Sequence, residues 1–149
     1  MNRTPQPRAG AIALVALVSL LAGSLSYEAA IAATQGQDAV AYLQNQFGIN
    51  ERQAQGALGA LLVYAREQLP KPQFDELASR MPNADLLMQA VQAQGVVTRP
   101  MSDIDDYRKS LGNLRISQQQ AAQIAPAVVQ FLGNAGFNEE QAILQGILR

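Results

Sequence analysis

The sequence predicts an all-α fold, a compact bundle of about six or seven helices. Three observations support this prediction. Apolar residues recur at three- and four-residue steps along most of the chain, which is the spacing of one helix face. No segment alternates apolar and polar residues for long enough to form a strand. Glycines, prolines and helix-capping residues fall between the apolar runs, where helices begin and end.

Residues 1–33 have the order of a secretory signal peptide. Arg3 and Arg8 give it a positive start, and the seventeen residues that follow, 9–25, carry no charge. Ala-Ile-Ala at 30–32 is a small-residue pattern of the kind that signal peptidase cleaves. We therefore expect cleavage at the end of this segment. The alternative is an uncleaved anchor, because an apolar run of this length is at the lower limit of a membrane-spanning helix.

Either alternative places residues 34–149 outside the cytoplasm. They would be periplasmic or secreted after cleavage, or held at the inner membrane by residues 9–25 without it. This length is enough for a single helical domain that, on folding, buries roughly two thirds of the surface that the unfolded chain exposes. Because the chain has no cysteine, the domain must be stabilised by its core rather than by disulfides. After cleavage nine basic and eleven acidic residues remain, a net charge of −2.

The first half of the domain is predicted to contain a short, a long and a second short helix. The first ends at Gly48, because glycine readily adopts the left-handed conformation that closes a helix. Pro70 and Pro72 separate the long helix from the next one. The apolar faces are Ala54, Ala57, Leu58, Leu61, Leu62, Ala65 and Leu69, and then Phe74, Leu77, Ala78 and Met81.

A connection then leads to a second half with the same order of elements. The connection contains a helix at 83–94 and, after Gly95, a loop around 96–102. Gly136 is expected to end the long helix of this half. The apolar faces are Ile104, Tyr107, Leu111 and Leu114, then Ala121, Ile124, Val128, Phe131, Leu132 and Ala135, and last Ile143, Leu144, Ile147 and Leu148.

Three helix starts carry a capping-box pattern, in which a cap residue is followed three positions later by glutamine. Each cap residue also follows an apolar residue that can pack one turn inside its helix. The pairs are Asn50 with Gln53, Ser117 with Gln120, and Asn138 with Gln141, preceded by Ile49, Ile116 and Phe137.

The two halves are predicted to be duplicated helix-turn-helix units, packed with pseudo-symmetry. The repeats are 38–81 and 105–148, joined by 82–104. A shift of 67 residues places the first long helix on the second and aligns Gln53 with Gln120. The alternative is chance similarity, because few positions are identical.

The same shift places Gly59 opposite Pro126, and we expect the two long helices to cross closely there. Gly56 and Gly59 lie on one helix face among small residues. We interpret them as close packing within one core, and the alternative is an association surface in a membrane or a dimer.

A motif runs through residues 48–88. It consists of Ile49, Gln53-Ala54, Gly56, Gly59, Leu61-Leu62, Ala65-Arg66, Leu69, Phe74-Asp75, Leu77 and Met81-Pro82. This motif resembles a bacterial family of unknown function, the VcgC/VcgE-like domain, and residues 114–148 resemble its C-terminal part more loosely. Ala57 departs from the family pattern, which has glycine, and the Gly/Ser-rich middle is shortened to 95–102. The resemblance implies a small exported or envelope-associated helical protein, and it supplies no catalytic or binding residue.

The composition disfavours catalysis. Without histidine or cysteine there is no imidazole base, thiol nucleophile or Cys/His metal cage. The acidic group at 103–106 does not fit a calcium loop, because Arg108 stands where glycine is needed. We expect Ser102 to cap a helix that has these carboxylates in its first turn. We therefore predict no catalytic, cofactor-binding or metal-binding residue and no cofactor, with a carboxylate-based hydrolase as the disfavoured alternative.

Binding is the function that the sequence favours. Nucleic-acid binding needs a basic stripe, whereas Arg108, Lys109 and Arg115 form only a small positive spot, expected to be solvated. Many glutamines give the helices a neutral polar surface that can hydrogen-bond to a partner. We predict a non-enzymatic exported module that binds an unknown protein or a second copy of itself. The alternative is a binder of a small apolar ligand or lipid between the two halves.

Overall fold

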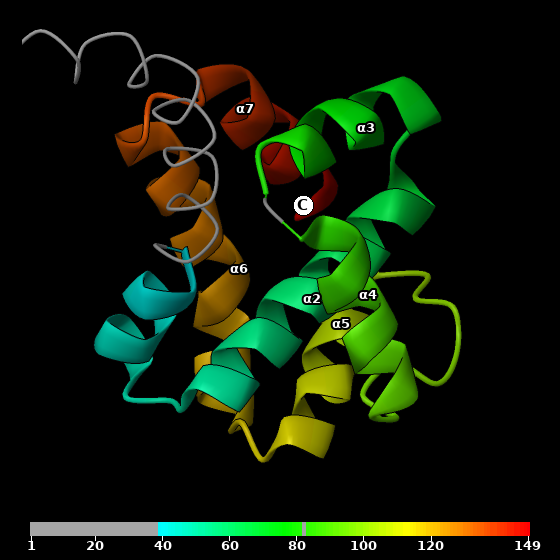
Figure 1. The fold of residues 1–149 in the computed structure, drawn as a ribbon, viewed down its shortest axis with the longest axis vertical. Coiled ribbons are helices and arrows are strands. Elements are labelled where there is room, and N and C mark those ends of the chain that lie inside the picture. Colours follow the sequence, from blue (N-terminus) through cyan, green and yellow to red (C-terminus); the bar gives the residue numbers. More distant parts are fainter. Residues whose placement is uncertain (1–38, 82) are drawn as a thin grey trace, which may run out of the picture. The chain divides into compact units, whose positions relative to one another are not determined.

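The computed structural model describes residues 39–81 and 83–149, and every regular element in these residues is a helix (Figure 1). A helical segment at 39–47 comes first. It is followed by α2 (Glu51–Gln68), α3 (Lys71–Ser79), α4 (Ala84–Ala93), α5 (Ile104–Leu111), the 3-10 turn η1 (Gly112–Leu114), α6 (Gln118–Asn134) and α7 (Asn138–Ile147). The all-α prediction is confirmed, and seven α-helical segments in the described ranges agree with the number expected.

The predicted signal segment, its alternative as an anchor at 9–25 and the cleavage site lie outside the described residues. Within residues 39–81 and 83–149, no helix is both long enough and apolar enough to cross a membrane.

Helix α2 lies at the centre of this bundle, and every residue from Gly56 to Ala65 is buried. It packs most extensively against α4 and also contacts α5, while α6 packs mainly against α7 and α5. The largest fully buried side chain is Tyr107, and the others are aliphatic, among them Leu43, Leu58, Leu77 and Ile124. Burial of each such leucine side chain stabilises the folded state by about 1.5–3 kcal/mol relative to an exposed side chain. A core of this kind explains how the fold forms without disulfides.

The predicted close crossing of the two long helices at Gly59 and Pro126 is wrong. A Cβ atom on Gly59 would lie 2.5 Å from the carbonyl oxygen of Leu87 in α4, so Gly59 allows α4, not α6, to approach. Pro126 lies inside α6 on its exposed face, where water can solvate the carbonyl group that proline leaves without a donor. Gly56 faces Leu114, and a Cβ atom on Gly56 would lie 2.6 Å from Cδ1 of that leucine. Both glycines therefore serve packing within one core, as the first interpretation had it.

Two of the three predicted capping boxes are confirmed, those of Asn50 with Gln53 at α2 and Ser117 with Gln120 at α6. The third is wrong, because α7 already includes Asn138 and its cap position is Phe137. The amide of Phe137 donates to the carbonyl of Leu132 across the preceding turn, 2.9 Å away. An equivalent bond runs from the amide of Ile116 to Leu111 in front of the confirmed box of Ser117, so it does not by itself exclude a cap. The difference lies in Gln141, whose side-chain amide lies against Gly133 of α6.

The predicted cap of α5 is also displaced by one residue. Asp103, not Ser102, is the cap, and its carboxylate accepts from the amide of Asp106 at 2.8 Å. The amide of Ser102 instead donates to the side chain of Asp106 at 3.2 Å. Asp105 and Asp106 lie in the first turn of α5, as expected from the favourable interaction of carboxylates with a helix N-terminus.

The element starts repeat at the offset found in the sequence. Helices α2 and α6 begin at residues 51 and 118, and α3 and α7 begin at 71 and 138, so both pairs differ by 67. The glycine ends are also as predicted, with φ of 64° at Gly48, 68° at Gly95 and 86° at Gly136. At the offset position of Gly48, the left-handed conformation is held by Arg115, with φ 59°. Duplication itself stays a prediction.

Candidate functional site

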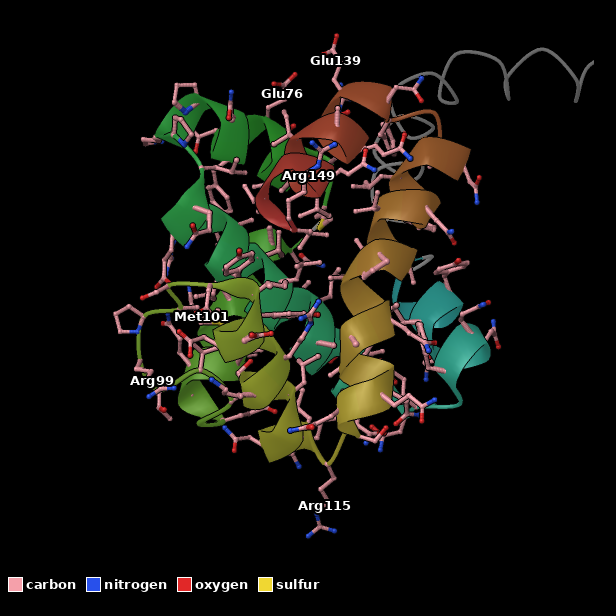
Figure 2. The ribbon with its side chains drawn as sticks, turned by 180° about the vertical axis from the view of Figure 1, so that it is seen from behind. Glu76, Arg99, Met101, Arg115, Glu139 and Arg149 are labelled. Atoms are coloured by element: carbon pink, nitrogen blue, oxygen red, sulfur yellow. The ribbon has the colours of Figure 1, made fainter. Side chains whose placement is uncertain are left out.

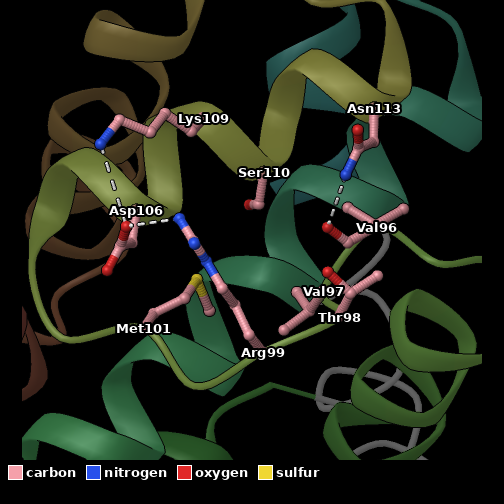
Figure 3. A pocket seen from close by; sticks show the side chains of 9 residues that line it. All are labelled: Val96, Val97, Thr98, Arg99, Met101, Asp106, Lys109, Ser110 and Asn113. Carbon is pink, nitrogen blue, oxygen red and sulfur yellow. Dashed lines mark hydrogen bonds and ion pairs between the residues drawn. The ribbon is translucent and has the colours of Figure 1, made fainter.

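Two neighbouring hollows lie where the loop after α4 meets α5, η1 and the start of α2. The first has a volume of about 230 Å³ and lies between the loop residues Val96–Met101 and α5 (Figure 3). The second has a volume of about 460 Å³ and is lined by the start of α2, Gln94 and the residues around Arg115. Val96 and Asn113 line both, so the two hollows adjoin. We call them together the loop face.

The loop between α4 and α5 is held at both of its ends. The side-chain amide of Asn113 donates to the carbonyl of Val96 at 3.1 Å (Figure 3). At the other end the carboxylate of Glu67 accepts from the amide of Met101 at 2.5 Å, and Gln68 donates to the carbonyl of Met101 at 3.0 Å. The loop therefore presents its side chains from a fixed backbone although it has no regular structure.

The first hollow contains two cations and one carboxylate. Arg99 pairs with Asp106 at 3.2 Å, and the Lys109 ammonium is 4.0 Å from the same carboxylate oxygen. The side chains of Arg99 and Lys109 are mostly exposed, whereas only 17% of the Asp106 side chain is exposed. One carboxylate is thus shared by two cations, and the hollow keeps an excess positive charge.

The second hollow is lined by two cations, Arg52 and Arg115, and by no carboxylate. The Nε of Arg52 donates to the Gln94 side chain at 3.2 Å, which orients the guanidinium and leaves its terminal nitrogens available. Arg115 forms no ion pair with an acidic group in residues 39–81 and 83–149, and Figure 2 shows it projecting from the end of the bundle. The remaining polar lining is amide, from Asn50, Gln53, Gln94 and Asn113.

The small positive spot predicted from the sequence is therefore only partly right. Lys109 and Arg115 line the loop face, but Arg108 pairs with Asp105 at 2.8 Å. Arg52 and Arg99 were not singled out, because they come from α2 and from the loop. Only the tertiary fold brings these separate segments together.

The acidic residues do not gather into a metal site in the part of the chain that the structure describes. Asp103 caps α5, Asp105 pairs with Arg108, and Asp106 pairs with Arg99. Lys71 and Asp75 pair on the exposed surface of α3 at 2.6 Å. These carboxylates stabilise helices or balance nearby cations, and no two of them are paired in a common hollow.

The family of this chain follows from a comparison of its sequence with known families. The family model described as "Protein of unknown function VcgC/VcgE" matches residues 16–148. The chain belongs to this family. No curated protein and no solved structure is significantly similar to it. The resemblance predicted from the motif at 48–88 is confirmed, and since the VcgC/VcgE family has no known function, it assigns no role to the loop face.

Away from the loop face, this VcgC/VcgE-family chain has one buried charged residue among those described, Glu140 in α7, which is 3% exposed. Its carboxylate accepts from the Nε of Arg80 at 2.7 Å, and the Arg80 guanidinium lies 5.4 Å from the centre of the Phe137 ring. The hydrogen bond to Glu140, followed by its charge, raises the pKa of Arg80. This contact joins the end of α3 to α7.

Two tyrosines lie close together in the core, with 6.3 Å between the ring centres of Tyr64 and Tyr107. The hydroxyl of Tyr64 donates to the carbonyl of Ile147 at 2.8 Å, which links α2 to the end of α7. Burial raises the pKa of both phenols, and that of Tyr107 lies far above its ordinary value because the side chain is fully buried. Neither ring lines the loop face.

A third hollow lies at the junction of α3 and α4 and has a volume of about 470 Å³. Leu86 is on its rim and is 63% exposed, the only large apolar side chain so exposed in the described ranges. A single exposed leucine is common on protein surfaces. The loop face, which combines cations and amides from three segments, is therefore the stronger candidate for function.

Proposed function

We propose that this VcgC/VcgE-family chain is a non-enzymatic binding module that acts outside the cytoplasm, and that the loop face is its contact surface for a protein partner. The single observation that carries the proposal is the convergence of four cations from α2, the loop and the α5–η1 region on two adjoining hollows. They are Arg52, Arg99, Lys109 and Arg115.

The loop face has properties that suit recognition. Its backbone is held by Asn113, Glu67 and Gln68, so little ordering is needed when a partner binds. Arginine and amide side chains offer several donors each, and arginine is enriched at protein interfaces. The surface is therefore prepared for polar contacts, and a polar partner is favoured over the small apolar ligand that the sequence left as an alternative.

The same residues give little support to hydrolysis. Glycoside hydrolysis by carboxylates generally needs two of them flanking the bond that breaks. The loop face supplies only Asp106, and that carboxylate is already paired with Arg99 and close to Lys109. A binding role needs no such pair.

Export is proposed from the order of charges and apolar residues at 1–33. A fusion of this segment to alkaline phosphatase, which is active only after export, tests it. Activity of the fusion is expected, and loss of activity is expected when Arg3 and Arg8 are both replaced by glutamate. An inactive fusion would contradict export.

Site-specific photocrosslinking in the producing cell tests the contact surface. A photoreactive residue at Thr98, which is exposed and lines the first hollow, is expected to give one discrete adduct. The same residue at Gln145, exposed on α7, is the matched control and should give none. An adduct of twice the chain's mass would identify self-association, the other binding mode that the sequence predicts. Equal labelling from both positions, or none from either, would contradict the proposal.

A further inference from the structure

We infer that the loop face binds an acidic polypeptide segment, with Arg52 and Arg115 as the residues that hold its carboxylates. The inference rests on the proposed function, because it takes the same surface and names the chemistry of the partner. It goes further by assigning the charge, the extended form and the anchoring residues of that interaction.

The charge of this face is opposite to that of the domain as a whole. Residues 34–149 carry a net charge of −2, yet the loop face has four cations and only the carboxylate of Asp106 among its lining residues. Figure 2 shows Glu76 and Glu139 at the end of the bundle opposite to Arg115. An acidic segment would therefore be attracted to the loop face rather than to the domain as a whole.

The conformation of Arg115 indicates that its side chain matters. Its φ of 59° lies in the left-handed region, where a non-glycine residue is strained by about 1 kcal/mol. At the offset position in the first half, the same conformation is held by Gly48, which has no such strain. Arg115 therefore keeps a long cationic side chain at a place where glycine would be more stable, and it lines the second hollow.

The capping box of α2 uses two of the backbone amides that border the second hollow. Phosphate groups are commonly held by free amides at a helix N-terminus. At the start of α2 the amide of Gln53 already donates to Asn50 at 2.9 Å, and that of Asn50 donates to Gln53 at 3.0 Å. Arginine forks match carboxylates, and the flanking amides of Gln94 and Asn113 can bond to peptide groups. Arginine forks match phosphate as well, so the flanking amides, which can bond to a peptide backbone, are what favours an acidic peptide over a compact phosphate ion.

The spacing of the charges favours an extended ligand. Two cations line each hollow, and the hollows meet at Val96 and Asn113. A single small anion can occupy only one of them, whereas a peptide with carboxylates several residues apart reaches both. Because Asp106 already balances part of the charge of the first hollow, Arg52 and Arg115 in the second hollow are the principal anchors.

Fluorescence anisotropy with the full-length gene product, purified in the form that the cell leaves it, tests the inference directly. The probe is a labelled peptide of alternating glutamate and glycine, and the matched control replaces each glutamate by glutamine. At low ionic strength the glutamate peptide is expected to bind at least about tenfold more tightly than the control. Equal affinity for the two peptides would overturn the inference.

Three variants assign the binding to the second hollow. Arg52→Gln and Arg115→Gln are each expected to weaken binding of the glutamate peptide by about three- to fivefold. Arg66→Gln removes an exposed arginine from the other end of α2, which does not line the loop face, and should change the affinity less than about twofold. If Arg66→Gln weakened binding as much as the other two, the attraction would be non-specific and the inference wrong.

Arg115→Gly separates binding from folding. It removes the cation and the backbone strain together, so the variant is expected to unfold at a higher temperature and still bind the peptide more weakly. A variant that binds with undiminished affinity would overturn the role of Arg115.

Inorganic phosphate, phosphatidylglycerol vesicles and duplex DNA are the competing probes, and binding of any of them as tightly as the peptide would overturn the assignment to an acidic polypeptide.

The two proposals can fail separately. A discrete adduct at Thr98 together with no preference for the glutamate peptide would overturn only the acidic partner. Specific peptide binding with no adduct at Thr98 in the cell would contradict the proposed function instead.

Discussion

Gln53 and Gln120 make equivalent hydrogen bonds, each to a backbone carbonyl in the opposite half of the domain. The side-chain amide of Gln53 donates to the carbonyl of Leu114 at 3.0 Å, and that of Gln120 donates to the carbonyl of Phe47 at 3.1 Å. Leu114 lies three positions before Ser117, the cap of α6, and Phe47 lies three positions before Asn50, the cap of α2. Each glutamine also completes its own capping box. One side chain thus starts a helix and ties it to the opposite half.

Replacement of Gln53 by alanine should lower the free energy of unfolding by about 1–2 kcal/mol, because it removes a cap bond and the bond to Leu114. Gln53→Glu keeps the oxygen that accepts from Asn50 but loses the donor, so about 1 kcal/mol is expected. Urea unfolding followed by circular dichroism measures both. Gln55→Ala, which affects only an exposed bond to Glu51, is the control and should change stability by less than about 0.5 kcal/mol.

Three glycines, two in α2 and one in η1, should differ in their tolerance of alanine. At Gly59 a methyl group meets the backbone oxygen of Leu87 at 2.5 Å, so α4 must move and a loss of about 1–3 kcal/mol is expected. At Gly56 the obstacle is the flexible side chain of Leu114, and the loss should be smaller. At Gly112 a Cβ meets nothing within 4 Å, so alanine should stabilise by about 0.5–1 kcal/mol. Unfolding free energies in any other order would contradict this account of the packing.

Local patterns made most helix boundaries predictable. The starts of α2 and α6 follow from a cap residue and a glutamine three positions later, both within one helix turn. The predicted start of α7 is wrong by one residue because the side-chain amide of Gln141 lies against Gly133 of α6, a tertiary contact that the local pattern does not display. Gly59 correctly predicted that another segment approaches α2 closely. Which helix approaches depends on the tertiary fold, and it is α4.

The loop face was less predictable than the helices. Lys109 and Arg115 are near one another in the sequence and gave a signal, but Arg52 reaches them from α2 through packing alone. Whether a cation is available depends on its partner, and Arg108 is paired with Asp105 whereas Arg115 has no acidic partner in the described ranges. Such pairing depends on side-chain positions, which the order of charges does not determine.

The contact between Arg80 and Glu140 should be asymmetric in its effect on stability. Arg80→Met leaves the carboxylate of Glu140 buried without a cation, whereas Glu140→Gln leaves an uncharged acceptor beside a half-exposed arginine. The first variant is therefore expected to lower the melting temperature more than the second. The double variant should melt at a higher temperature than Arg80→Met alone, because it has no buried unpaired carboxylate. Calorimetry of the three proteins measures this, and the reverse order would contradict the larger cost assigned to the unpaired carboxylate.

Stability should fall at alkaline pH because of the buried phenols. The pKa of Tyr107 is raised on folding, so the native state favours the protonated phenol. This contribution is complete below the pKa of an unfolded tyrosine, about 10, and is lost progressively as the pH rises above it. Urea unfolding at a series of pH values should show this decline. Tyr107→Phe should reduce its slope and cost little at neutral pH, because the hydroxyl is 3.5 Å from its acceptor, the carbonyl of Ala57.

The loop that carries Arg99 should become mobile when its anchor on α2 is removed. Glu67 accepts from the amide of Met101 at 2.5 Å, and a hydrogen bond to a charged acceptor contributes about 1.5–3 kcal/mol. Glu67→Ala is therefore expected to accelerate hydrogen exchange at the Met101 amide by about 10- to 100-fold while the amides of the buried part of α2 keep their rates. Glu67→Gln retains an oxygen acceptor and should give a smaller increase. If exchange at Met101 were unchanged in Glu67→Ala, the bonds of Gln68 to the loop would suffice, and the rigidity of the loop face would not depend on this carboxylate.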